Sequence, residues 1–307
     1  MTDKLEKPAK KTWKKVNGLV IVNKPEGLTS NAVLQKVRRF YSAEKAGHTG
    51  ALDPFATGLL PICFGEATKI SGLLLDADKG YIATLKLGQA TDSGDKDGEP
   101  ALTAEVPVLT SAQIASTLET FLGDSTQVPP MYSALKYQGK PLYSYARQGI
   151  EIERPARHIH LSYLKLLEFN GSDTLKFEVN CSKGTYVRTL GEDIAQALGT
   201  VGHLIALHRV LTGCLTADLM MDMDELATKV ALDESYGLLP LDLPLGHLES
   251  LNLSQEQTDF IQHGGMLALP KPATELVKFY NPEGVFFGVG EWSDTKQMVK
   301  AKRLFNL

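Results

Sequence analysis

The sequence predicts a mixed α+β fold, in which helices flank a mainly antiparallel sheet, followed by a small β-rich C-terminal domain. Residues 81–87 alternate apolar and polar side chains, as a half-buried strand does. Two further alternating runs, near 159–163 and 175–181, flank the dipeptide Asn170-Gly171, which is typical of an antiparallel hairpin. Apolar residues recur at helical spacing in several of the segments between these strands.

The composition is that of an ordinary soluble globular protein. The 307 residues suffice for more than one domain, and 43% of them are hydrophobic. No apolar run reaches the roughly 18 residues of a membrane span, and no apolar segment of a secretory signal follows the lysine-rich N-terminus. The cysteines lie far apart without a nearby histidine pair, so we predict no structural zinc and interpret all three as buried thiols in a reducing cytoplasm: Cys63, Cys181 and Cys214.

Charge is distributed unevenly along the chain. The net charge of −4 argues against a uniformly basic surface. Basic residues nevertheless dominate residues 4–15 and 134–165, whereas acidic residues dominate 224–256. This pattern predicts a cationic face that suits a phosphate backbone, although a solvated lysine run explains residues 4–15 equally well.

The chain divides into three parts. Residues 1–15 have little apolar content, which predicts a flexible basic arm. Residues 16–242 form the main domain, and a proline-containing linker near 238–245 leads to a small module at 243–307. Within the main domain, residues 123–156 break the regular pattern and predict a long insertion.

In the first half, we expect strands and helices to alternate. The apolar, β-branched run 18–22 predicts a strand, and Thr29 or Ser30 can cap the helix that follows. The remaining elements expected before the insertion are an apolar run at 59–62, a short helix at 67–75, a strand at 81–87 and an amphipathic helix at 113–122.

In the second half, the hairpin strands precede a helix that Tyr186 opens and Gly199 ends. Residues 203–207 then lead to a strand at 210–215. For the C-terminal module we predict an all-β unit with strands at 267–269, 275–280, 285–289 and 298–304.

Two segments have the composition of metal sites, and we reject both. Residues 91–98 are rich in Asp and Gly but lack the closing glutamate of a calcium loop. His158 and His160 share one strand face without a third ligand nearby, so we expect an exposed polar face.

The stretch Gly47–Pro61 holds one carboxylate, Asp53, between Gly50 and Gly58. Because Pro54 disfavours helical geometry at the residue before it, Asp53 is expected on a stiff, non-helical turn. A short carboxylate displayed in this way suits a nucleophile or a general base. The alternative is that Asp-Pro simply starts a turn.

Three further motifs accompany this loop, and the set closely resembles the bacterial tRNA pseudouridine synthases that act on the T-arm uridine at position 55 (the TruB family). The motifs are Val22-Asn23-Lys24-Pro25-Glu26-Gly27, Asp78-Lys79-Gly80-Tyr81 and Cys181-Ser182-Lys183-Gly184-Thr185-Tyr186-Val187-Arg188-Thr189. The resemblance runs from about residue 17 to about 222 and recurs more weakly in the tail. It implies the pseudouridine synthase fold and a catalytic domain over 16–242.

The resemblance also implies roles for individual residues. Asp53 matches the catalytic carboxylate, and Arg188 matches the arginine that pairs with it. Tyr81 matches the tyrosine that stacks on the target uracil, and Lys24 and Pro25 match residues that shape the pocket. The other matches are His48 at the edge of the flipped nucleotide and the pocket-lining residues Tyr186 and Leu207.

Simpler interpretations exist for several of these residues. Arg188 could form a surface ion pair at a helix start. Tyr186 and Leu207 could serve in core packing, and His48 could be a turn residue.

The insertion at 123–156 interleaves tyrosines with lysines and arginines, as contact with unpaired bases and phosphates requires. In the family this insertion is a thumb that clamps the RNA stem-loop; the alternative is a lid that packs its tyrosines on the domain. The C-terminal module similarly resembles a PUA-type RNA-binding domain.

These observations lead to the hypothesis of a cytoplasmic enzyme that isomerises the T-loop uridine 55 of tRNA to pseudouridine. The reaction needs no cofactor, consistent with the lack of a nucleotide fingerprint or P-loop motif, and the expected partner is the T-arm of tRNA, with no obligate protein partner evident. One rival is an RNA-binding or tRNA-folding protein with incidental catalysis. The other is an aspartate-dependent hydrolase, but a glycosidase normally needs a second carboxylate, and none is evident near Asp53.

Overall fold

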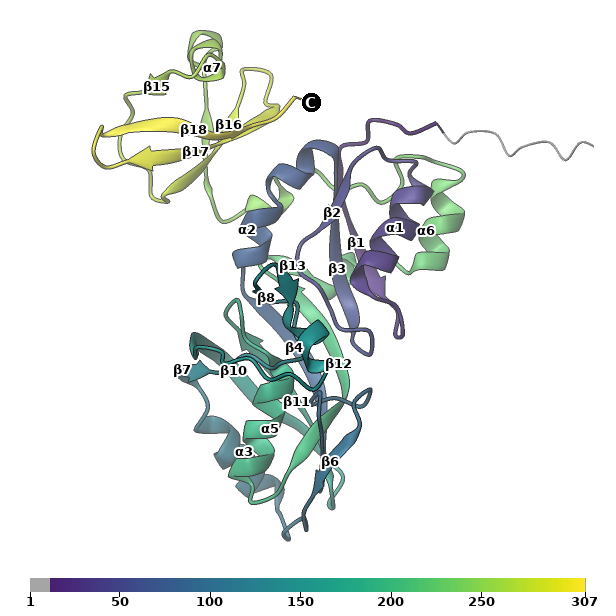
Figure 1. Ribbon diagram of the computed structural model, residues 1–307. Helices are drawn as coiled ribbons and strands as arrows, with labels where there is room; N and C mark the ends of the chain where they lie inside the picture. The colour runs from purple at the N-terminus through teal and green to yellow at the C-terminus, as the bar shows by residue number, and fades with distance from the viewer. Residues whose placement is uncertain (1–11, 307) are drawn as a thin grey trace, which may run out of the picture.

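The computed structural model describes residues 12–306 and consists of an elongated main domain with a smaller β-rich module at one end (Figure 1). The predicted basic arm at 1–15 therefore lies largely outside the described residues. No helix within 12–306 is long and apolar enough to cross a membrane.

The main domain is built on a nine-stranded sheet that is antiparallel except where β12 lies beside β3. The order along the sheet is β1-β3-β12-β4-β11-β10-β7, with β2 beside β3 and β13 beside β12. This confirms the predicted mixed fold with a mainly antiparallel sheet. The strands are β1 Gly18–Lys24, β2 Ala46–His48, β3 Thr57–Phe64, β4 Lys79–Leu87, β7 Gly123–Gln127, β10 Arg157–Phe169, β11 Thr174–Cys181, β12 Gly202–Thr212 and β13 Leu215–Thr216.

The part of the sheet formed by β1 and β3 is buried on both faces. Along β1, Val20 and Val22 join the core beneath α1 (Ser30–Phe40) and α6 (Met223–Val230), while Leu19 and Ile21 face the opposite core. Helix α1 begins as predicted, because the Thr29 side chain accepts a hydrogen bond from the Ala32 N–H at 3.1 Å.

The second half of the sheet is covered on one face by α3 (Ser111–Glu119) and α5 (Val187–Ala197) (Figure 1). Their apolar side chains pack against alternate residues of β4 and β11 in one continuous core. The short hairpin of β5 (Gln89–Thr91) and β6 (Pro100–Thr103) extends from this half.

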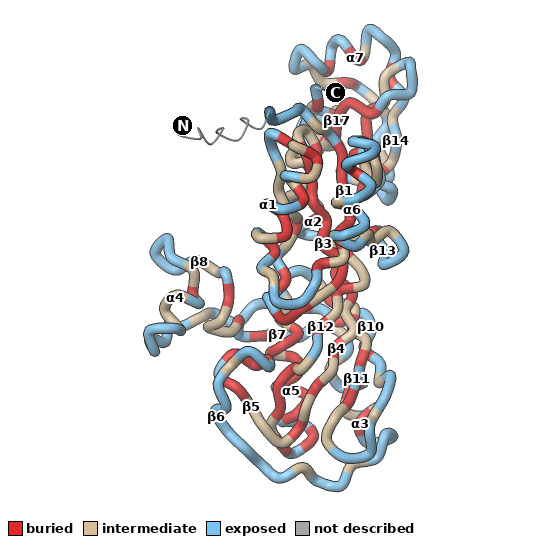
Figure 2. The backbone as a smooth tube through the Cα atoms, turned by 90° about the vertical axis from the view of Figure 1, so that its right-hand side faces the viewer, coloured by how far each residue is buried: buried red, intermediate tan, exposed pale blue. Residues whose placement is uncertain are grey.

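The predicted insertion starts later than the sequence indicated. Its first five residues form β7, which pairs with β10 at the edge of the sheet. The segment that leaves the sheet is therefore 128–156, and it projects from the body of the domain (Figure 2). We call it the thumb; it contains β8 (Lys136–Tyr137), β9 (Lys140–Pro141) and α4 (Leu142–Ala146).

Three further expectations need correction. The helix expected at 67–75 is divided into η1 (Gly65–Lys69) and α2 (Ser71–Asp76), and β12 starts at Gly202, before the expected 210. Cys63 and Cys181 are buried free thiols, but Cys214 is exposed because it lies in the turn between β12 and β13.

The C-terminal module is β-rich, but it is not all-β. Its sheet has the order β14-β16-β17-β18-β15, and α7 (Gln255–Gln262) packs on it. Ser254 and Gln257 form a capping box that starts α7, so the sequence did contain a helix signal there. The strands are β14 Glu249–Asn252, β15 Met266–Leu267, β16 Leu276–Tyr280, β17 Phe286–Ser293 and β18 Met298–Leu304.

The module shares a hydrophobic core with the main domain. Phe286 and Phe305 of the module belong to the same buried cluster as Ile70 and Leu74 of the main domain. Polar contacts join the two parts as well: the Lys69 ammonium donates to the Leu304 carbonyl at 2.9 Å. The two parts are therefore held together by burial as well as by the chain connection.

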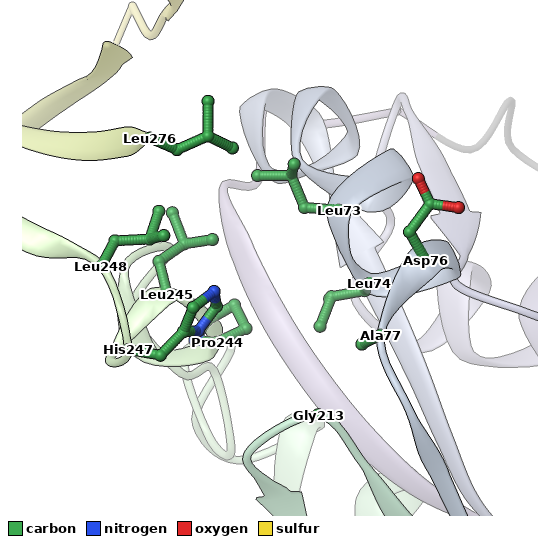
Figure 3. A pocket seen from close by; sticks show the side chains of 10 residues that line it. All are labelled: Leu73, Leu74, Asp76, Ala77, Gly213, Pro244, Leu245, His247, Leu248 and Leu276. Atoms are coloured by element: carbon green, nitrogen blue, oxygen red, sulfur yellow. The ribbon is translucent and has the colours of Figure 1, made fainter. Parts of the chain in front are cut away.

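The predicted linker at 238–245 is packed into this junction. Leu239 forms a bridge with Leu19 of β1, and Leu241 and Leu245 are buried. A largely apolar cavity of about 210 Å³ remains between α2, the β12–β13 turn and the module; Figure 3 shows the side chains that line it, among them Leu73, Leu248 and Leu276.

We predict that Phe305→Ala lowers the free energy of unfolding of the whole chain by about 3 kcal/mol, because it leaves a cavity in the shared core. Phe305 is 5% exposed, and its ring centroid lies 5.1 Å from that of Phe286. Urea unfolding followed by circular dichroism measures the change. The control Val285→Ala alters a residue that is 48% exposed and should change stability by about 0.5 kcal/mol or less. Equal effects of the two variants would contradict a shared core.

Candidate active site

The Asp53 loop joins β2 to β3 and is held by Lys24, the last residue of β1. The buried Lys24 ammonium donates to the carbonyls of Pro25, Pro54 and Ala56 at 2.9, 3.1 and 2.7 Å. Burial lowers the pKa of Lys24 to about 8, and the nearby Asp53 opposes this change. Lys24 thus fixes the loop backbone immediately after Asp53.

Two glycines give this loop its shape, as the sequence indicated. Gly50 has a φ of +104° and Gly58 a φ of +98°. A side-chain Cβ at Gly58 would lie 2.3 Å from the Arg209 carbonyl oxygen of β12. Only glycine permits this close approach of the two backbones.

The side chain of Arg188, at the start of α5, connects Asp53 with two other segments. Its Nε lies 3.0 Å from Asp53 Oδ2, and its Nη1 lies 3.2 Å from Asp95 Oδ2. Nη1 also donates to the Ser93 carbonyl and Nη2 to the Tyr132 carbonyl, both at 2.6 Å. Because the Arg188 side chain is 4% exposed, the interpretation of a surface ion pair was wrong.

The two carboxylates around Arg188 differ in their surroundings. The Asp53 side chain is 41% exposed and that of Asp95 is 6% exposed. Asp95 Oδ1 accepts hydrogen bonds from the Ser93 hydroxyl at 2.7 Å and the Asp97 N–H at 3.1 Å. Burial raises the pKa of Asp53, and the Arg188 guanidinium opposes that rise. Asp53 is therefore the carboxylate that a ligand can reach.

Tyr81 and His48 lie near a second buried arginine, Arg209 of β12. Arg209 is 1% exposed and donates to the Leu59 carbonyl at 2.6 Å. Burial raises the pKa of Tyr81, and the Arg209 charge opposes this rise. Burial and Arg209 together lower the pKa of His48, which therefore favours the neutral ring. His48 is located in β2, so the interpretation as a turn residue was wrong.

Tyr186 and Leu207 approach the site from two further elements. The Tyr186 N–H donates to Gln127 Oε1 at 2.8 Å, and Gln127 Nε2 donates to the Tyr186 carbonyl at 3.1 Å. Gln127 is the residue at which the thumb leaves the sheet. Leu207 is 7% exposed and belongs to the same apolar cluster as Leu52 of the Asp53 loop, with Tyr81 packed against it. The structure thus brings all six predicted site residues into one region.

The thumb packs one of its tyrosines on the domain and keeps the others within itself. The Tyr132 hydroxyl donates to Asp92 Oδ2 at 2.8 Å. Tyr137 and Tyr145 form an edge-to-face pair with centroids 5.9 Å apart, and Arg147 lies over Tyr143. Tyr137 and Tyr143 are 42% and 41% exposed, so both remain accessible on the thumb.

Sequence reasoning missed Asp95 and Arg209. Asp95 lies in the stretch 91–98, which we considered only as a calcium loop. Arg209 stands within a mainly apolar strand, which is an unusual place for a permanent charge and was a usable signal. A second carboxylate does lie near Asp53, contrary to the expectation from the sequence, because Asp95 and Asp53 both contact Arg188.

Comparison with solved structures identifies the fold class. A chain in the crystal structure of a Cbf5–Nop10–Gar1 complex superimposes with a TM-score of 0.73 at 24% identity, covering 94% of this chain and 85% of that chain. A chain in the structure of an H/ACA RNP bound to a substrate RNA containing 2′-deoxyuridine gives a TM-score of 0.71 at 21% identity, covering 94% and 85% of the two chains. The main domain therefore has the pseudouridine synthase fold.

Sequence comparisons identify the family. Residues 38–187 match the TruB family pseudouridylate synthase N-terminal domain, 188–245 the tRNA pseudouridylate synthase B C-terminal domain, and 250–305 the pseudouridine synthase II TruB C-terminal domain. The tRNA pseudouridine synthase B of Hydrogenovibrio crunogenus is 63% identical, covering 97% of both chains. That of Dechloromonas aromatica is 47% identical, covering 92% of this chain and 93% of the relative. The chain belongs to the TruB family of pseudouridylate synthases.

We predict that Arg188→Met lowers the free energy of unfolding by about 3 kcal/mol at neutral pH, because it leaves the buried Asp95 and the partly exposed Asp53 without their cation. The loss of the cation raises the pKa of Asp53 in the folded state still further above its value in the unfolded chain. The folded variant then binds a proton that the unfolded chain has lost. The difference in free energy of unfolding between the variant and the unaltered protein should therefore shrink as the pH falls toward the raised pKa. Urea unfolding at pH 5 and pH 8 tests this, and a difference that does not change with pH would contradict it. The control Lys176→Met removes an exposed lysine of β11.

Proposed function

We propose that this protein converts the T-loop uridine at position 55 of tRNA to pseudouridine, with Asp53 as the catalytic carboxylate. The observation that carries the proposal is the pairing of a solvent-accessible Asp53 with the buried Arg188, in a chain 63% identical to a tRNA pseudouridine synthase B. Incubation with unmodified tRNA, followed by mapping of pseudouridine, tests it directly.

The reaction is an isomerisation at one ribose carbon. The bond between uracil N1 and C1′ breaks, and the base turns within the site. C5 then bonds to C1′ and loses its proton, while N1 gains a proton, so that product and substrate have the same atoms. Asp53 acts on this carbon, as a nucleophile or by assisting base departure and proton removal. Both routes need an ionised carboxylate, which Arg188 favours against the opposing effect of burial.

The remaining site residues are proposed to hold the flipped-out uridine. A uridine in an RNA loop must leave its stack before its C1′ can be reached, and stacking on an aromatic ring offsets that cost. We assign this stacking role to Tyr81, which packs against the cluster that contains Leu207. Tyr186 and Leu207 line the pocket, and the neutral ring of His48 lies at the edge of the nucleotide.

The hydrolase alternative is disfavoured by the surroundings of Asp95. A glycosidase needs two carboxyl groups that reach its substrate. The Asp95 side chain is 6% exposed, and its oxygens are engaged by Arg188, the Ser93 hydroxyl and the Asp97 N–H. Asp95 therefore positions Arg188 and is not available to a substrate.

The thumb and the C-terminal module are proposed as RNA-binding parts of the enzyme, which acts on the T-arm in the cytoplasm. The exposed Tyr137 and Tyr143, with Arg147 beside the latter, present aromatic and cationic groups together, as a clamp on single-stranded RNA requires. The alternative of an RNA-folding protein explains these surfaces, but it does not explain the Asp53–Arg188 pair.

We predict that Asp53→Asn abolishes pseudouridine formation while tRNA binding changes by about tenfold or less. The amide has nearly the same shape but is a poor nucleophile and base, whereas affinity depends largely on phosphate contacts. Single-turnover assays and filter binding give the two quantities. Asp97→Asn, a change in the neighbouring loop, is the control and should retain turnover. Residual activity of Asp53→Asn near that of the unaltered protein would contradict the catalytic assignment.

We predict that the activity of Arg188→Met increases with pH over a range in which the unaltered protein is already at its plateau. Without the guanidinium, the Asp53 pKa rises and the neutral acid persists to higher pH. Arg188→Lys keeps the charge but loses the planar fork, so its turnover should fall without this pH dependence. Single-turnover pH profiles on a T-arm stem-loop distinguish the two variants. If the Met profile is parallel to that of the unaltered protein, Arg188 does not set the ionisation of Asp53.

A further inference from the structure

A cleft of about 270 Å³ lies where the first described residues pass the end of the chain. We call it the N-terminal cleft; its walls come from residues 14–17, 44–45, 65–66 and Asn306. Figure 2 shows the N-terminal segment entering beside the C-terminal end of the chain. Segments of the main domain and the C-terminal module thus form one concave surface.

The rim of the N-terminal cleft carries ammonium groups that form no ion pair with a described residue. Lys15 and Lys45 are exposed, and no described residue accepts a hydrogen bond or forms an ion pair with either ammonium group. Arg38 adds a third cation: its side chain is bound to the carbonyls of Ala43 and Glu44 at 2.9 and 2.7 Å rather than to a carboxylate.

Negative charge at this cleft is smaller and partly engaged. Glu66 accepts hydrogen bonds from Lys69 at 2.5 Å and from the Asn306 N–H at 2.8 Å. These hydrogen bonds, first that of Lys69, lower the pKa of Glu66, and the charges of Lys69 and Lys45 add to this effect. Glu44 is the exposed carboxylate of the rim, and Lys14 is paired with Glu234. A net positive rim therefore remains.

An aromatic residue, Trp13, directly precedes Lys14 of the cleft in the chain. The Arg38 guanidinium lies 4.4 Å from the ring centroid of Trp13, which is 39% exposed. An exposed aromatic ring among cations is typical of surfaces that contact RNA.

The N-terminal cleft is remote from the catalytic carboxylate. The Asp53 loop leads into the start of β3 at Thr57, whereas Gly65 of the cleft follows the end of β3 at Phe64. Eight residues of extended strand place these ends about 20 Å apart. A ligand in the cleft cannot be the target nucleotide, but a long RNA bound at Asp53 can reach it.

We propose that the N-terminal cleft binds the phosphate backbone of tRNA at a position outside the T-arm loop. The proposal rests on the proposed function, because it assigns a second contact to the same substrate. Lysines suit this role, since each ammonium group can neutralise one phosphate and release its counterion. The contact would favour whole tRNA over a short RNA that contains the target uridine alone.

The test compares two RNAs, an unmodified full-length tRNA and an isolated T-arm stem-loop. The double variant Lys15→Gln/Lys45→Gln removes the two ammonium groups that form no ion pair with a described residue, and Lys176→Gln is the matched control on β11. Dissociation constants are measured at several salt concentrations, together with single-turnover rates at saturating RNA. Thermal unfolding checks that each variant folds.

We expect the double variant to bind full-length tRNA about fivefold more weakly and to bind the stem-loop within about twofold of the unaltered protein. The slope of log affinity against log salt for full-length tRNA should become shallower by about two, one for each lysine. Rates at saturation and the behaviour of Lys176→Gln should not change.

Unchanged affinity for full-length tRNA would overturn the proposal, and so would an equal loss on both RNAs, which would indicate a general effect of charge. Failure of the unaltered protein to modify either RNA would instead overturn the proposed function. The binding comparison would still decide whether the N-terminal cleft contacts RNA.

Discussion

The buried guanidinium of Arg188 is the interaction on which the rest of the site depends. A buried cation is costly unless it is paired and its N–H groups are bonded. Arg188 meets this requirement through two carboxylates and two carbonyls, which come from the Asp53 loop, the loop of Ser93 and Asp95, and the thumb root at Tyr132. These three segments are irregular, and one side chain at the start of α5 joins them to one another.

The position and the charge of Asp53 have separate supports. Its position comes from the backbone, through the carbonyls bound by Lys24 and the close approach at Gly58. Its charge depends on Arg188, because burial favours the neutral acid. The same chemistry explains why Asp95 is needed: with Asp53 open to a ligand, a second, enclosed carboxylate keeps the arginine compensated and oriented.

The C-terminal module is part of the same physical unit. Phe286 and Phe305 complete a core that begins on β1 and β3, and Lys69 binds the end of β18. The module therefore holds a defined position relative to the catalytic sheet. Its Asn306 can therefore form one wall of the N-terminal cleft, whose lysines belong to the main domain.

The sequence by itself determined the features that follow from local patterns: the alternating strands, the Asn170-Gly171 hairpin, the Thr29 cap and the loop geometry of Asp53. The family motifs also pointed to Arg188. Tertiary structure decided the rest. Strand β7 has no apolar alternation, because it is an edge strand defined by its pairing with β10. Asp95 and Arg209 acquire their roles from partners that lie far away in the chain, and the linker is buried because the module packs on α2. Local periodicity records which face of an element is buried, but only the folded chain determines which charges meet.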